Sequence, residues 1–225
     1  MQQRPITHLS GKFDEHAADT VLMLALTLSR HAGNDAEPVI PTTIAGKTLG
    51  LVGFDPTAQV LIKRASRGFG MRVLVHGASG ADRMIAMQLG ADISPSLDHL
   101  FTEADIVSLH GDPGVGATIV DAHRLNQMKP DACLINTAHG KLVDEQALLH
   151  ALWFETIGGA GFAVAEATLS HAAGLRDCAN AIVLPALPKS AFAKTNHHPE
   201  SPPDIPMAAA DNVIRLFANE QQQAW

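Results

Sequence analysis

Short apolar segments alternate with helix-forming segments along most of this sequence, and this alternation limits the fold more than any other feature. The apolar segments are residues 49–52, 73–76, 106–109, 133–136, 162–164 and 182–184. Their first residues are about 20 to 33 residues apart, a spacing that suits strand–helix–strand crossovers. Several are almost continuously apolar, as strands buried on both faces are. The sequence therefore predicts an α/β fold with a doubly wound parallel sheet of the Rossmann type.

A long helix precedes this alternating region. Apolar residues recur with helical spacing over about residues 14–31, which predicts one amphipathic helix. Leu24 and Leu26 widen its apolar face beyond what a surface helix needs. We therefore expect both sides of this helix to be covered. A last helix is predicted to begin at Pro206, after a polar, proline-rich loop.

Charge and hydropathy exclude several classes of partner. Lys and Arg number 16 against 23 Asp and Glu, and no basic run occurs. Nucleic acid is therefore not expected as a partner, because neutralising phosphates needs clustered basic residues. The longest apolar stretch, residues 21–28, is too short to span a membrane, and the N-terminus lacks a signal-peptide core. These features predict a cytoplasmic protein without a membrane partner.

Cysteine and histidine usage predicts no disulfide framework and no metal site. Cys133 lies in an apolar run, where a thiol serves as a small core residue, and Cys178 is the second cysteine. His197 and His198 are adjacent rather than four residues apart, and no cysteine or acidic cluster accompanies them.

The turn after the first strand is where a fold of this type would hold phosphate groups. A dinucleotide fingerprint reads Gly-x-Gly-x-x-Gly/Ala, and Gly53 and Ala58 occupy its outer positions. Asp55 stands at the middle position, where only a missing side chain lets the backbone approach a pyrophosphate. The candidate cofactor-binding residues are Gly53, Asp55, Thr57, Ala58, His76 and Ser79.

A second interpretation of the same turn needs no phosphate. Asp55 and Pro56 are a favourable N-cap and first helical residue. The carboxylate would then occupy the helix N-terminus that a phosphate otherwise uses. The sequence favours this self-capped helix over a phosphate site.

Several longer strings resemble one enzyme family. They are residues 48–54 (TLGLVGF), 70–75 (GMRVLV), 103–110 (EADIVSLH), 128–138 (MKPDACLINTA) and 140–148 (GKLVDEQAL). Together they resemble the D-isomer-specific 2-hydroxyacid dehydrogenases, the group that includes phosphoglycerate and glycerate dehydrogenases. The resemblance implies an NAD(P)-binding lobe, NAD or NADP as cofactor, and a homodimer formed through this lobe and its long first helix. It also implies an N-terminal substrate lobe, which these 225 residues do not contain.

On this resemblance, the chain divides into three parts. Residues 1–40 are the leading helix and connector, 41–190 the Rossmann-type dinucleotide-binding domain, and 191–225 a polar loop and a C-terminal helix that packs back.

The catalytic positions of the family are altered in this sequence. The resemblance implies an Arg that binds the substrate carboxylate, and that position holds His139. A His cannot supply the permanently charged, bidentate fork of an Arg. The family's Glu falls on Thr168, with Glu166 two residues before it, and the family's His falls on Ala186. The candidate catalytic residues that remain are His139 and Glu166.

Three functional hypotheses follow. The first is a catalytically degenerate relative that keeps the NAD(P)-binding fold as a dimeric scaffold or binding module, with Asp55 opposing cofactor binding. The second is an active NAD(P)-dependent oxidoreductase that acts on a 2-hydroxy or 2-keto acid through His139 or Glu166. The third is one chain of a split enzyme, with the substrate lobe supplied by a separate protein partner.

Overall fold

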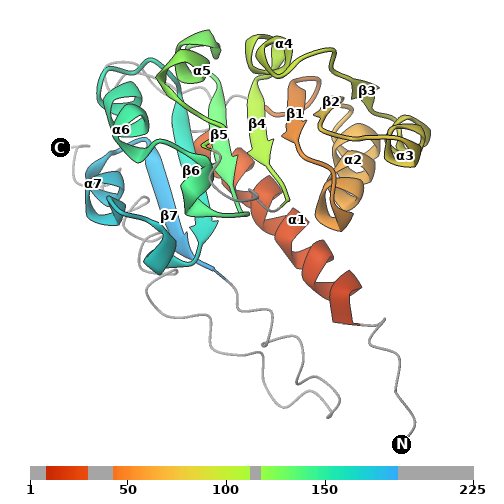
Figure 1. The fold of residues 1–225 in the computed structure, drawn as a ribbon, viewed down its shortest axis with the longest axis horizontal. Coiled ribbons are helices and arrows are strands. Elements are labelled where there is room, and N and C mark those ends of the chain that lie inside the picture. The colour runs from red at the N-terminus through yellow and green to blue at the C-terminus, as the bar shows by residue number, and fades with distance from the viewer. Residues whose placement is uncertain (1–8, 30–42, 112–117, 187–225) are drawn as a thin grey trace, which may run out of the picture. The chain divides into compact units, whose positions relative to one another are not determined.

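A single parallel sheet organises the described part of the molecule (Figure 1). The structure is a computed structural model that describes residues 9–29, 43–111 and 118–186. Within these residues, seven strands pair in the order β3-β2-β1-β4-β5-β6-β7. Their bounds are β1 Thr48–Val52, β2 Arg72–His76, β3 Asp92–Ile93, β4 Ile106–Leu109, β5 Cys133–Asn136, β6 Gly159–Val164 and β7 Ala181–Pro185. The predicted doubly wound parallel sheet is confirmed.

The strand order reverses direction between β1 and β4, which makes this pair the switch point of the sheet. Leu49 of β1 pairs with Ile106 of β4, and Val52 pairs with Leu109, so both strands end at the same level. The turns that follow these two strands therefore leave the same edge of the sheet next to each other.

Helices cover both faces of the sheet. They are α1 Leu9–Leu28, α2 Pro56–Gly68, α3 Ala81–Leu89, α4 Leu97–Glu103, α5 Ala122–Gln127, α6 Glu145–Trp153 and α7 Ala172–Asp177, with short 3-10 helices η1 Gly140–Leu142 and η2 Glu166–Thr168. Helices α1 and α2 pack against each other, as do α4 with α5 and α5 with α6. Right-handed crossovers in opposite directions from β1 and β4 place α2 and α5 on opposite faces.

Helix α1 reaches the sheet through two glycines of β6. A Cβ atom at Gly161 would lie 3.2 Å from Leu24, and one at Gly159 would lie 3.0 Å from Leu28. The absence of these side chains lets α1 pack closely. Leu24 is fully buried by this contact, whereas Leu26 is 41% exposed. Within one chain the Leu24 side of α1 is covered and the Leu26 side is not.

Strand β3 has no counterpart among the predicted strands. It has only two residues, Asp92 and Ile93, and it lies at the edge of the sheet beside β2. Strand β6 begins at Gly159, three residues before its predicted start at Phe162, because Gly and Ala lack the β-branched or aromatic character that marks a strand in sequence.

The two cysteines are buried. Burial raises the pKa of the Cys133 thiol to about 12, so this thiol stays protonated in the core. The prediction that Cys133 is a core residue is confirmed.

The compact unit ends at Ala186. The predicted last helix, His197 and His198 lie outside the described residues. The domain boundaries at residues 40 and 190 stay predictions.

Candidate functional site

The candidate site is the pair of turns that follow β1 and β4 at the switch point. Gly53 begins the first turn with φ of 99°, and its N–H donates a 2.8 Å hydrogen bond to the carbonyl of His76. A Cβ atom at Gly53 would lie 2.2 Å from the carbonyl oxygen of His110, the first residue after β4. Gly53 is therefore required by the close approach of the two turns.

Asp55 is the N-cap of α2. Its backbone is extended, with φ of −123° and ψ of 177°, and Pro56 opens the helix. Its Oδ1 accepts a 2.7 Å hydrogen bond from the backbone N–H of Ala58. The predicted self-capping of this helix by Asp55 is confirmed. The carboxylate stands where a bound phosphate would accept hydrogen bonds from the helix N-terminus.

The Asp55 carboxylate also meets a buried histidine across the switch point. His110 Nδ1 lies 3.5 Å from Asp55 Oδ1, and the His110 side chain is only 1% exposed. On its other side, His110 Nε2 lies 3.0 Å from the hydroxyl of Ser108, which is buried in β4. We call these three residues the Asp55–His110–Ser108 network.

The environment keeps the Asp55 carboxyl ionised. Burial acts to raise its pKa, but the hydrogen bond and charge of His110 and the backbone N–H groups of Ala58 and Gly111 lower it by more. The pKa of Asp55 is thus held below its ordinary value, and the group carries a negative charge at neutral pH. This charge lies on the N-terminus of α2, which is favourable for the helix dipole.

The other predicted cofactor-binding residues lie around the same turns with different contacts. Thr57 is buried against α1, where its hydroxyl donates a 3.1 Å hydrogen bond to Asp14. His76 is half-buried at the end of β2, and Ser79 is exposed in the turn before α3. The structure therefore brings Gly53, Asp55, Ala58 and His76 together around the β1 turn, while the Thr57 hydroxyl faces α1.

His139 lies in a tight turn after β5. The buried Asn136 side chain builds this turn, because its Oδ1 accepts from the N–H of His139 at 3.2 Å and its Nδ2 donates to the His139 carbonyl at 2.8 Å. The His139 ring caps η1, since Nδ1 accepts a 3.2 Å hydrogen bond from the N–H of Lys141. An accepting Nδ1 carries no proton, so the neutral ring holds its proton on Nε2.

The turn after β5 is pressed against the loop after β6. The Thr168 hydroxyl donates to the Ala165 carbonyl at 2.6 Å and accepts from the N–H of Gly140 at 3.3 Å. A Cβ atom at Gly140 would lie 2.3 Å from the Thr168 carbonyl oxygen. Glu166 begins η2 in this loop, so its backbone lies close to the Thr168 position.

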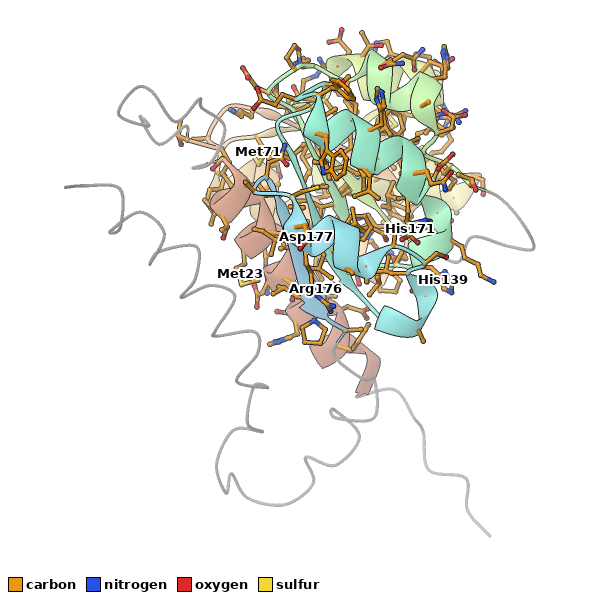
Figure 2. The ribbon with its side chains drawn as sticks, turned by 90° about the vertical axis from the view of Figure 1, so that its left-hand side faces the viewer. Met23, Met71, His139, His171, Arg176 and Asp177 are labelled. Atoms are coloured by element: carbon orange, nitrogen blue, oxygen red, sulfur yellow. The ribbon has the colours of Figure 1, made fainter. Side chains whose placement is uncertain are left out.

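A buried acid that the sequence did not single out holds the same loop. Glu145, in the first turn of α6, accepts hydrogen bonds from the N–H groups of Ser170 at 2.8 Å and His171 at 2.6 Å. Its Oε2 also lies 3.7 Å from His171 Nδ1. His139 and His171 lie toward the same side of the molecule (Figure 2). Glu145 thus fixes the segment that places Thr168 beside the His139 turn.

The described residues contain neither a metal cluster nor a membrane-spanning helix. No group of three or more His, Cys, Asp or Glu side chains in residues 9–29, 43–111 and 118–186 could hold a metal ion. None of the helices within those ranges is both long enough and apolar enough to cross a membrane.

Comparison with known proteins gives consistent matches. Residues 23–187 match the NAD-binding domain of the D-isomer specific 2-hydroxyacid dehydrogenases. The glyoxylate reductase of Thermococcus onnurineus is 41% identical over 125 residues, which are 55% of this chain and 36% of that protein. Glyoxylate/hydroxypyruvate reductase B of Pectobacterium carotovorum is 31% identical over 238 residues, covering 97% of this chain and 70% of that protein.

A solved structure agrees with these matches. The TT0316 protein of Thermus thermophilus superposes with a TM-score of 0.68 at 31% identity, over 96% of this chain and 68% of that chain. The match to the Thermococcus protein spans only about a third of that relative's length. The matched residues, the parallel sheet and the relatives together show that this chain belongs to the D-isomer specific 2-hydroxyacid dehydrogenase family, as its sequence strings implied.

Proposed function

We propose that this 2-hydroxyacid dehydrogenase-like chain does not transfer hydride and serves as a dimeric scaffold or binding module built on the dinucleotide-binding fold. One observation carries the proposal: the side chains that stand at the altered catalytic positions are engaged in local hydrogen bonds to the backbone. His139 caps η1 through Nδ1, and the Thr168 hydroxyl links Ala165 to Gly140.

The chemistry of these side chains supports the same conclusion. Binding a substrate carboxylate in two parallel hydrogen bonds needs a guanidinium, and His139 offers one N–H when neutral. Thr168 has no carboxylate with which to keep a histidine protonated. Ala186, after β7, has no group that can give or take a proton. The three functions that hydride transfer to a keto acid requires are therefore without a matching side chain at these positions.

Cofactor binding is expected to be weak for a separate reason. The ionised Asp55 carboxylate accepts the N–H of Ala58 at the start of α2, where a pyrophosphate would otherwise bind. A phosphate would meet a like charge there and would have to displace it. We therefore propose that NAD and NADP bind this chain poorly or not at all.

The second candidate function is an active NAD(P)-dependent oxidoreductase that acts on a 2-hydroxy or 2-keto acid. It is supported by relatives named as glyoxylate and hydroxypyruvate reductases. It is also supported by the partly exposed His139 ring, whose Nε2–H can donate a hydrogen bond at the carboxyl end of β5. In this candidate, His139 or Glu166 would replace the family's catalytic groups.

Turnover separates the two candidates. The purified chain is expected to oxidise neither NADH nor NADPH with glyoxylate or hydroxypyruvate, because no acid–base pair stands at the reacting positions. His139→Ala is expected to leave this null result unchanged. Cofactor oxidation that depends on substrate and is lost in His139→Ala would establish the second candidate. Turnover that appears only after addition of a lysate from the source cells would favour the split-enzyme hypothesis.

The proposed homodimer uses the exposed side of α1, on which Met23 lies (Figure 2). Met23 and Leu26 are both more than 40% exposed, whereas Leu24 is buried against the sheet. Sedimentation equilibrium is expected to report two chains for the wild type and one for Leu26→Lys, because a buried lysine disfavours the interface. Met84→Lys, at an exposed apolar site on α3, is the control and should remain a dimer. A monomeric wild type would contradict this assembly.

A further inference from the structure

The Asp55–His110–Ser108 network joins the two turns of the switch point. Asp55 belongs to the turn after β1, and His110 is the first residue after β4. Their side chains meet at 3.5 Å, beside the point where Gly53 passes the His110 carbonyl. The same carboxylate also accepts the N–H of Ala58. One anion therefore binds both sides of the crevice in which this type of sheet holds its ligands.

Both ring nitrogens of His110 face a polar group of the network. His110 Nδ1 lies 3.5 Å from Asp55 Oδ1, and His110 Nε2 lies within hydrogen-bond distance, 3.0 Å, of the Ser108 hydroxyl. Ser108 and the His110 ring are both buried, so each needs a partner within the protein. The Ser108 hydroxyl faces Nε2 of His110, and the Asp55 carboxylate faces Nδ1.

We propose that the Asp55–His110–Ser108 network is an autoinhibitory contact, in which the Asp55 carboxylate acts as an internal ligand that closes the crevice to nucleotide phosphates. This inference rests on the proposed function and deepens it, because it gives the physical cause of weak cofactor binding. It also implies that the rest of the crevice remains capable of receiving a phosphate. Weak nucleotide binding is then caused by one side chain, Asp55, rather than by changes throughout the fold.

The variants that test this separate the charge of Asp55 from its capping role. Asp55→Ser keeps a side-chain oxygen that can cap α2 but removes the charge. Asp55→Asn keeps the shape of the side chain and also removes its charge. It replaces Asp55→Ser in the test if the serine variant folds poorly. Asp121→Ser is the matched control, because Asp121 caps a different helix, α5, by accepting the N–H of Arg124 at 3.0 Å.

NADH fluorescence titration at neutral pH is the readout. Asp55→Ser is expected to bind NADH at least tenfold more tightly than the wild type, a change of about 1.4 kcal/mol. Asp121→Ser should bind as the wild type does. His110→Gln, which leaves the carboxylate on α2, should gain much less than Asp55→Ser. Thermal melting of each variant confirms that it is folded.

Two results would overturn the inference. The first is an unchanged NADH affinity in both folded Asp55 variants. The second is a gain in His110→Gln equal to that of Asp55→Ser, which would assign the closure to the histidine. A different result would contradict the proposed function, namely that Asp55→Ser binds NADH and also reduces a keto acid. Binding without turnover supports both conclusions.

Discussion

Gly53→Ala is expected to lower the free energy of unfolding by about 3 kcal/mol or more. Gly53 has φ of 99°, which an L side chain rarely adopts, and its Cβ would lie 2.2 Å from the backbone carbonyl oxygen of His110. That oxygen cannot move away alone, because the N–H of His110 is held by the Val52 carbonyl at 2.8 Å. The turns after β1 and β4 must therefore separate.

Gly46→Ala is the matched control for this collision. Gly46 also has a positive φ, of 75°, but a Cβ atom added there would have no other atom within 4 Å. Gly46→Ala should lower the free energy of unfolding by about 1 kcal/mol, because only the strain of the positive φ opposes the added side chain. Urea denaturation of both variants measures the difference. Equal losses in the two variants would show that the β1 and β4 turns are not in the close contact described.

Removal of the Glu145 side chain is the second large effect. Glu145→Ala leaves the N–H groups of Ser170 and His171 without their buried acceptor, so we expect a loss of about 2 to 5 kcal/mol in unfolding free energy. Amide exchange at both residues should also become faster, because the loop before α7 is released from α6.

Glu103→Ala is the control for a lost carboxylate. Glu103 forms an exposed 3.7 Å ion pair with Arg72, which contributes at most about 1 kcal/mol. If Glu145→Ala costs no more than Glu103→Ala in urea denaturation, Glu145 does not hold the loop in the way its hydrogen bonds indicate.

The fold could be predicted from the sequence because its signals are local. Most of the buried strands coincide with short apolar runs, and the pair Asp55–Pro56 marks the start of α2 through capping chemistry that involves neighbouring residues only. Strand β3 could not be predicted in this way, because two residues at a sheet edge, Asp92 and Ile93, form no apolar run.

The contacts within the candidate site could not be predicted from local signals. Asp55 and His110 are distant in sequence and meet only because the sheet places β1 beside β4. Glu145 follows a capping Asp144, so in sequence it has the pattern of an exposed first-turn acid, whereas its partners come from the loop after β6. A helix-start aspartate together with a histidine directly after a neighbouring strand is the signal that would have indicated the network.

Closure of the switch-point crevice to nucleotides by Asp55 is tested most directly by calorimetric titration of the unmodified chain with NADH and NADPH. The expected result is no saturable heat with either nucleotide up to about 1 mM, which corresponds to a binding free energy weaker than about 4 kcal/mol. Saturable binding tighter than about 100 μM, near 5.5 kcal/mol, would contradict the claim and would favour an active oxidoreductase.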